Sequence, residues 1–211
     1  MQLIGMLDSP YVRRVAISLQ LLGLRFEHRS LSVFRDFDEF HRVNPVVKAP
    51  TLVTDAGVVL MDSALILEYA ESLVHPRSLL PASRDELERD QRVIGLALAA
   101  CEKAVQIVYE NELRPPEKRH QSWLTRITGQ LLAAFGALER EIAEHPLAAT
   151  SDTIRQAGIS TAVAWKFTQA LLPGRVPASA HPALAAFSVR AESLAQFAAA
   201  PHGASTYRHA G

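Results

Sequence analysis

In the first third of the chain, short apolar runs alternate with stretches whose apolar residues recur every three or four positions. Residues 3–7 form a short apolar run, and residues 2–6 are predicted to form a buried strand. One face of a following helix carries Val12, Val15, Ala16, Leu19 and Leu22. Gly23 stands where that helix should stop. Residues 24–32 predict a second strand, so the pattern indicates a β-α-β unit.

A second group of short elements follows before residue 74. The turn signal Asp55-Ala56-Gly57 separates two apolar runs and predicts a pair of joined strands. Asp62 and Ser63 precede an apolar helical stretch and are expected to cap it. The elements predicted here are a short helix or loop at 36–43, strands at 51–53 and 58–61, and a helix at 64–73.

The rest of the chain has the hydrophobic pattern of long helices, apart from a linker at its start. Residues 75–83 contain Pro76 and Pro81 and no regular period, which predicts a linker. Beyond it the predicted helices are 84–113, 122–144, 159–172 and 182–194. We therefore expect an α/β domain over 1–74 and an all-α domain over 84–211, with a loosely packed tail from 201.

The composition argues against nucleic-acid binding, a membrane span and a metal site. The formal net charge is +0 and the pI is about 7.1, so no excess of basic residues exists to cover nucleic-acid phosphates. No apolar run approaches the ~18 residues of a membrane span, and no secretory leader is visible. Cys101 is the single cysteine and fits a reducing compartment such as the cytoplasm. The eight histidines are scattered without ligand spacing, so no metal site is expected.

The candidate chemistry begins at Ser9. Pro10 suits the first position of a helix, which places Ser9 at the N-cap. A hydroxyl there lies beside unpaired backbone N–H groups and the positive end of the helix dipole, where it can hold an anion, including a thiolate. The alternative is that Ser9 only caps the helix. Cys101 lies in an apolar helical run and is interpreted as a core residue.

Four segments, in this order and spacing, carry a family resemblance that covers nearly the whole chain. They are Ser-Pro-Tyr-Val-Arg-Arg-Val at 9–15, Asn-Pro-Val-Val-Lys-Ala-Pro-Thr-Leu at 44–52, Asp-Ser-Ala-Leu-Ile-Leu-Glu-Tyr at 62–69, and His-Pro-Ala-Leu at 181–184. Together they resemble the cytosolic glutathione S-transferases, in particular the bacterial, serine-type members. The resemblance implies a thioredoxin-like N-terminal domain followed by a C-terminal helical bundle.

The resemblance also implies a function and site residues. Glutathione would be the cosubstrate, and its thiolate, stabilised by Ser9, would attack a soft electrophile, as in detoxification. A cis Ala49–Pro50 bond would let the backbone of Ala49 pair with the cysteinyl part of glutathione. Lys48 is a candidate for the glycine carboxylate, or else a solvated surface lysine. Asp62 and Ser63 would bind the γ-glutamyl end.

Other assignments and rival functions stay open at this point. Tyr11 and Tyr109 are candidates for the electrophile pocket, although an aromatic at helical spacing is more often core. Arg13 and Arg14 are expected to be solvated. A homodimer follows from the family only. The rivals are a glutathione-dependent isomerase or peroxidase, and a binding protein that has lost turnover.

One segment departs from the family pattern. Residues 158–164 align with a stretch that normally carries a Ser/Thr-x-x-Asp capping box. Ser160 would be the N-cap, and Val163 replaces the acid. Because Val163 lies in an apolar run just before Trp165, we expect it to be packed in the core.

Overall fold

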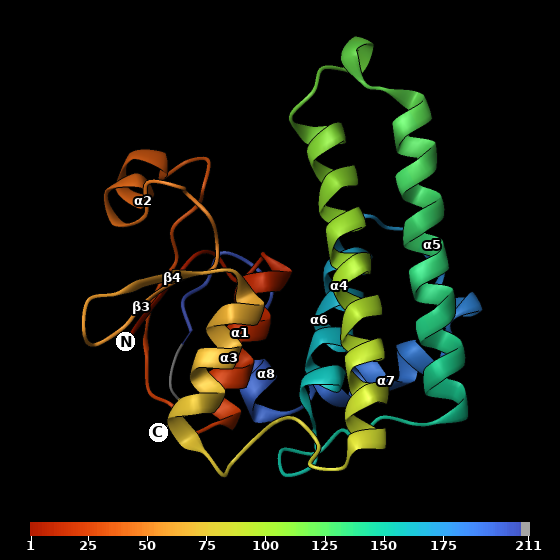
Figure 1. Cartoon of the computed structure of the whole chain (residues 1–211). Helices are drawn as coiled ribbons and strands as arrows, with labels where there is room; N and C mark the ends of the chain where they lie inside the picture. Colours follow the sequence, from red (N-terminus) through yellow and green to blue (C-terminus); the bar gives the residue numbers. More distant parts are fainter. Residues whose placement is uncertain (208–211) are drawn as a thin grey trace. The chain divides into compact units, whose positions relative to one another are not determined.

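The computed structural model describes residues 1–207, which form two compact units. The first unit comprises Met1–Leu80 together with 193–207, and the second is Pro81–Glu192. The α/β elements precede the long helices, as predicted (Figure 1). The domain ranges themselves stay predictions; segment 193–207 contacts the first unit although it follows the helical unit in sequence.

The first unit is built on a four-stranded sheet of order β2-β1-β3-β4. β1 pairs with β2 in parallel and with β3 antiparallel, and β3 pairs antiparallel with β4. The predicted β-α-β unit is therefore confirmed. The elements are β1 (Gln2–Ile4), α1 (Pro10–Leu21), β2 (Glu27–Arg29), α2 (Phe37–Val43), β3 (Thr51–Val53), β4 (Val59–Met61), α3 (Ser63–Val74) and α8 (Ala195–Ala199).

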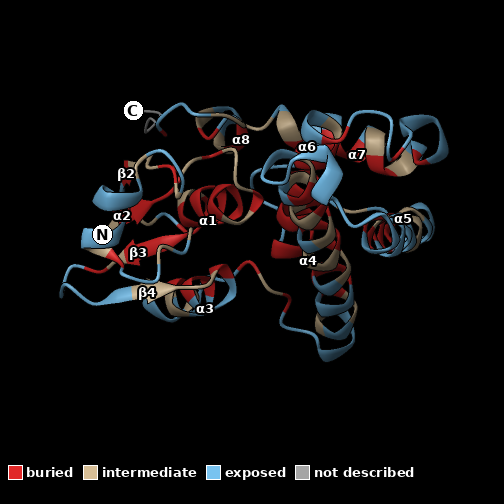
Figure 2. Cartoon of the chain, turned by 90° about the horizontal axis from the view of Figure 1, so that it is seen from above, coloured by how far each residue is buried: buried red, intermediate tan, exposed pale blue. Residues whose placement is uncertain are grey.

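Helix α1 is buried over most of its length (Figure 2). It packs on the sheet and beside α3 and α8. The helix ends where the sequence predicts, because Gly23 adopts φ +75, which suits a glycine after a helix. Gly57 likewise has φ +78 in the turn between β3 and β4.

Arg13 is where the structure first corrects the sequence prediction. Expected to be solvated, it is buried, and its Nε donates to the carbonyl of Ala200 over 2.7 Å. Its guanidinium also lies 5.6 Å from the centre of the Phe197 ring. A long-range partner thus satisfies the buried charge, and that partner lies more than 180 residues away in the sequence.

The last described residue of the chain is packed against the first unit. Tyr207 is buried, and its ring stacks on Phe26 at 4.6 Å between centroids. The backbone N–H of Tyr207 donates to Nδ1 of the buried His28 over 2.9 Å. The expectation of a loose tail from 201 is therefore wrong at Tyr207, whereas residues 201–206 are exposed or half-buried; residues 208–211 lie outside the described residues.

The second unit is a bundle in which α6 packs against α4 and α7. Its helices are α4 (Arg84–Glu112), α5 (Gln121–Glu144), α6 (Gln156–Leu171) and α7 (Pro182–Glu192), with short 3₁₀ turns at Pro116–Lys118 and Ala178–Ala180. Phe135 and Trp165 meet edge to face at 5.5 Å. Cys101 is buried, as predicted. Within residues 1–207 no helix is long and apolar enough to cross a membrane.

Helix α6 starts earlier than predicted. It begins at Gln156 with Arg155 at the N-cap, so Ser160 is not the cap. Ser160 instead lies buried inside the helix, where its hydroxyl accepts from Nε2 of Gln156 over 3.3 Å. The missed start has a physical reason: almost every residue from Gln156 onward is buried, and this burial stabilises the first turn without a side-chain cap. Val163 is 1% exposed, which confirms its prediction as a core residue.

The burial of Val163 gives the first testable prediction. Val163→Asp would place a carboxylate without a partner in the core, so we expect it to lower the free energy of unfolding by roughly 3–5 kcal/mol. Urea denaturation followed by circular dichroism measures this. Val189→Asp on α7, where the valine is 73% exposed, is the control and should change little. Equal effects of the two variants would contradict the burial argument.

His28 gives the second prediction, a pH dependence of stability. Because Nδ1 accepts from the N–H of Tyr207, the ring is neutral, and Nε2 donates to the carbonyl of Gly5 over 2.7 Å. Burial lowers the pKa of His28. The unfolded chain therefore takes up the proton first as the pH falls through about 6.5, and the folded state loses stability below that pH.

The measurement compares wild type with His28→Gln from about pH 8 to about pH 5. The free energy of unfolding of wild type should fall more steeply than that of the variant. Parallel curves for the two proteins would show that His28 is not the group responsible.

Candidate functional site

The predicted site residues lie at one edge of the sheet. Register pairs Ile4 with Thr51 and Thr51 with Met61, so β1 and β4 end in the same row in which β3 begins. Ser9 follows β1, Lys48 and Ala49 precede β3, and Asp62 and Ser63 follow β4. The sheet therefore brings together residues from three segments that are far apart in the sequence.

A glycine sets how closely two of these segments approach. Gly5 follows β1 with φ +131. A Cβ atom built on it would lie 2.7 Å from Cγ2 of Val12 and 3.0 Å from Cβ of Ala49. Any side chain at this position would push α1 and the Ala49 segment apart, so Gly5 keeps Ala49 next to the first turn of α1.

Ser9 is the N-cap of α1, as the sequence predicts. Its φ and ψ are −68 and 124, and Pro10 takes the first helical position. The Ser9 hydroxyl accepts from the backbone N–H of Val12 over 3.4 Å, a long hydrogen bond. In that bond the hydroxyl is the acceptor, so its own proton remains available to donate to an anion.

Asp8 is a titratable neighbour that the sequence analysis did not single out. It precedes Ser9 and is half-buried. Burial raises the pKa of its carboxyl, while the charges of His202 and Arg35 oppose the rise.

The segment before β3 is held by its own polar side chains. Asn44 donates from Nδ2 to the hydroxyl of Thr51 over 2.8 Å, and that hydroxyl donates to the carbonyl of Lys48 over 2.7 Å. The Ala49–Pro50 peptide bond is cis, as predicted. Within residues 1–207 the structure gives the backbone of Ala49 no hydrogen-bond partner.

Lys48 is exposed, and its Nζ lies 3.7 Å from Oδ2 of Asp62. Both side chains are about half exposed, so this ion pair contributes no more than about 1 kcal/mol to stability. Lys48 is thus a surface lysine that extends toward the start of α3, and a competing anion displaces it from Asp62 at little cost.

The two residues at the start of α3 have different roles, which corrects the expectation that both cap the helix. Asp62 is the N-cap, and its Oδ1 accepts from the N–H of Ala64 over 2.9 Å. Ser63 is the first helical residue and is buried. Its Oγ lies 3.1 Å from Nη1 of Arg14, so the hydroxyl is directed toward α1 instead of capping α3.

Arg14 is the site neighbour that sequence reasoning missed. Predicted to be solvated, it is only 3% exposed. A signal was available in the composition of α1, whose twelve residues carry no charged side chain except Arg13 and Arg14. A helix so poor in charge is packed on several sides, and its few cations are then buried with partners.

The two tyrosines predicted for an electrophile pocket lie in different units. Tyr11 is half-buried in the first turn of α1, two positions after Ser9. Tyr109 lies on α4 and is 43% exposed, so the alternative that it belongs to the core is wrong. A shared pocket for these residues stays a prediction.

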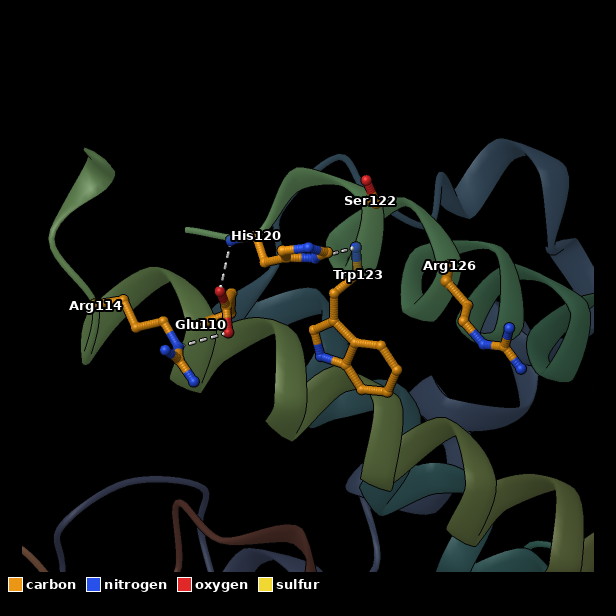
Figure 3. A pocket seen from close by; sticks show the side chains of 6 residues that line it. All are labelled: Glu110, Arg114, His120, Ser122, Trp123 and Arg126. Carbon is orange, nitrogen blue, oxygen red and sulfur yellow. Dashed lines mark hydrogen bonds and ion pairs between the residues drawn. The ribbon is translucent and has the colours of Figure 1, made fainter. Parts of the chain in front are cut away.

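A separate hollow of about 640 Å³ lies at the end of the α4–α5 hairpin (Figure 3). The buried carboxylate of Glu110 pairs with Nε of Arg114 at 2.8 Å and accepts from the N–H of His120 at 2.9 Å. His120 in turn caps α5 through Nδ1, which accepts from the N–H of Trp123. These polar groups hold the hairpin end together, and no predicted site residue lines the hollow.

Within the described part of the chain, no group of three or more His, Cys, Asp or Glu side chains is placed to hold a metal ion.

Comparisons with known proteins identify the family of this chain. Residues 3–78 match the model of the glutathione S-transferase N-terminal domain. The uncharacterized GST-like protein YibF of Escherichia coli is 30% identical over 166 residues, which cover 78% of this chain and 80% of YibF. A maleylacetoacetate isomerase of Pseudomonas aeruginosa is 30% identical over 135 residues, which cover 59% of this chain and 63% of the isomerase.

A solved structure extends the likeness to nearly the whole chain. A glutathione transferase family member of Pseudomonas fluorescens Pf-5, with bound S-(propanoic acid)-glutathione, is 29% identical with a TM-score of 0.78. The match covers 95% of this chain and 98% of that one. The chain belongs to the glutathione S-transferase family. The fold expected from the resemblance, a thioredoxin-like domain followed by a helical domain, is confirmed.

Proposed function

We propose that this protein binds glutathione at the sheet edge that carries Ser9, Ala49 and Ser63, and transfers its thiolate to a soft electrophile. The observation that carries the proposal is the common row of Ile4, Thr51 and Met61, which brings the N-termini of α1 and α3 to that edge. The bound S-(propanoic acid)-glutathione of the Pseudomonas fluorescens relative supports glutathione as the ligand.

The γ-glutamyl end of glutathione is assigned to the start of α3. A helix N-terminus offers unpaired N–H groups and a positive dipole end to a carboxylate. The buried Ser63 hydroxyl adds a donor beside those groups, and the half-exposed Asp62 supplies a carboxylate for the α-amine.

The middle and the glycine end are assigned to the segment before β3. The backbone N–H and carbonyl of Ala49 would pair with the cysteinyl residue as a neighbouring strand would. Lys48 is exposed and only weakly held by Asp62, so its Nζ can turn to the glycine carboxylate.

Ser9 is assigned the role of thiolate stabiliser. A free thiol has a pKa near ~8.5, so only a few per cent is thiolate at neutral pH. Lowering the pKa of the bound thiol by about two requires roughly 2.7 kcal/mol of preference for the anion. The Ser9 O–H and the N-terminus of α1 together can supply that preference. Serine forms no mixed disulfide, which favours conjugation or peroxide reduction over thiol–disulfide exchange.

Two other functions use the same site. The similarity to a maleylacetoacetate isomerase favours, as a second candidate, a glutathione-dependent isomerisation. The third candidate function is glutathione binding without catalytic turnover. Retention on immobilised glutathione followed by assays with halides, epoxides, isothiocyanates, hydroperoxides and cis-dienoic acids separates them. Retention without any turnover would leave only the binding protein.

The assembly and location belong to the proposal as well. We propose a homodimer, the state implied by the family, and a cytoplasmic location, which the single buried cysteine supports because it requires no oxidising compartment. Light scattering of the purified protein measures the assembly directly.

The testable prediction of this mechanism concerns Ser9. Ser9→Ala should raise the pKa of the thiol of bound glutathione by about one to two, equivalent to roughly 1.4–2.7 kcal/mol, because the anion loses its hydroxyl donor. The affinity for glutathione should change much less. Ultraviolet titration of the bound thiolate measures the pKa.

Ser72→Ala on the exposed side of α3 is the matched control and should titrate as wild type does. If Ser9→Ala also titrates as wild type does, then Ser9 only caps α1.

A further inference from the structure

His28 is a buried histidine on β2 whose two ring nitrogens contact different parts of the first unit. Nδ1 accepts from the backbone N–H of Tyr207 over 2.9 Å. Nε2 lies 2.7 Å from the carbonyl oxygen of Gly5. The side chain therefore joins the C-terminal segment to the residue that directly follows β1.

The bond from Tyr207 determines which nitrogen of His28 carries the proton. A backbone N–H can only donate, so Nδ1 must be the unprotonated acceptor. In a neutral ring the proton is then on Nε2, from which it is donated to Gly5. Burial lowers the pKa of His28 and so favours this neutral ring. The C-terminal segment thus sets the direction of the bond to Gly5.

Gly5 is the point at which the chain leaves the sheet toward Ser9. Its N–H donates to the carbonyl of Arg29 over 3.0 Å, in line with the β1–β2 ladder, whereas its carbonyl accepts from the His28 ring. Its φ of +131 lies outside the range of a strand, so the ladder does not set the orientation of its carbonyl. Because glycine is conformationally permissive, the bond from His28 restricts that orientation.

A change at Gly5 would reach Ser9 through a short turn. Residues 6–8 separate the two, and the N–H of Ser9 donates back to the carbonyl of Met6 over 3.2 Å. The Gly5–Met6 peptide begins this turn, so its orientation affects where the turn places the Ser9 hydroxyl. Val12 and Ala49 also lie close to the Gly5 backbone, which leaves little room for a second arrangement.

We propose that His28 is a positioning residue for the stabilisation of the glutathione thiolate. Held in one tautomer by the C-terminal segment, it fixes the Gly5 carbonyl and with it the turn that carries Ser9. In this role His28 acts through Ser9 and not by contact with glutathione. This inference rests on the proposed function, because it concerns the placement of the proposed thiolate stabiliser.

Two amide variants separate the two hydrogen bonds of His28. The amide nitrogen of Gln is as many bonds from Cβ as Nε2 of His, so His28→Gln can still donate to Gly5. The side chain of Asn is shorter. His28→Asn keeps an acceptor at about the position of Nδ1 for Tyr207, but it does not reach Gly5. Both variants lack the titratable ring, so they differ mainly in the bond to Gly5.

Ultraviolet titration of the thiolate of bound glutathione is the measurement. His28→Asn should raise the pKa of the bound thiol by about 0.5–1, a roughly three- to tenfold lower ratio of thiolate to thiol. His28→Gln should leave this pKa within about 0.3 of wild type. Equal shifts in the two variants, or no shift in His28→Asn, would overturn the proposal.

Val163→Ala is the control for a general loss of stability. It truncates a buried side chain of the second unit, so it should destabilise the protein and leave the pKa of the bound thiol unchanged. A rise as large as that in His28→Asn would mean that destabilisation alone moves the thiol pKa, and it would overturn the assignment of His28.

A double-mutant cycle tests the route through Ser9. In the Ser9→Ala background, His28→Asn should raise the pKa of the bound thiol no further, because the hydroxyl that it would misplace is absent. A rise of the same size as in the wild-type background would overturn this route.

Nitrogen-15 NMR of the wild-type protein tests the tautomer, with the His28 signals assigned as those lost in His28→Gln. The proton is expected on Nε2, and a proton on Nδ1 would overturn the proposal. If His28→Asn does not fold, as judged by circular dichroism, His28→Thr takes its place, because threonine suits a strand and does not reach Gly5. An unchanged thiol pKa in that variant overturns the proposal. Failure of the proposed function looks different, because wild type itself would then bind no glutathione or leave its thiol pKa at the value of the free tripeptide.

Discussion

The register of β3 between β1 and β4 is the constraint on which the candidate site depends. Each of these strands has only three residues. The row of Ile4, Thr51 and Met61 nevertheless fixes where the segments after β1, before β3 and after β4 join the sheet. A slip of one residue would turn the buried Leu52 to the other face of the sheet and displace both neighbouring segments. The tight packing around Gly5 opposes such a slip, because Val12 of α1 and Ala49 both lie close to the Gly5 backbone there.

Burial of two cations in α1 follows from the same arrangement. The helix is enclosed by the sheet, α3 and α8, so no face of its middle turns reaches solvent. A guanidinium in this position needs acceptors, and its length lets it find them on neighbouring elements. Arg13 donates a hydrogen bond to the carbonyl of Ala200, and Arg14 donates one to the hydroxyl of Ser63. Adjacent residues of identical type thus bond to different elements, one to the C-terminal segment and one to the start of α3.

The features predicted correctly from the sequence are those that local chemistry determines. Ser9 and Pro10 start a helix and Gly23 ends it through interactions within a few residues. The features missed depend on partners far away in the chain. The buried Arg14 donates to Ser63 of α3, and Tyr207 stacks on Phe26, which precedes it by more than 180 residues. The composition of α1 signals that its arginines are buried, but no local pattern identifies the partners of these residues. The prediction of Ser160 as N-cap was wrong for a related reason, because the first turn of α6 is stabilised by burial rather than by a side-chain cap.

The charges around the sheet edge match the proposed ligand group by group. Glutathione carries a carboxylate at each end, a sulfur that must become an anion, and one amine. The edge offers the N-terminus of α1 with Ser9 for the sulfur and the exposed Lys48 for one carboxylate. In the proposed assignment, Ser63 at the start of α3 serves the other carboxylate, and Asp62, which caps that helix, serves the amine. A ligand with fewer anions would leave the helix N-termini and the exposed Lys48 without a matching charge, so the proposed site would select against it.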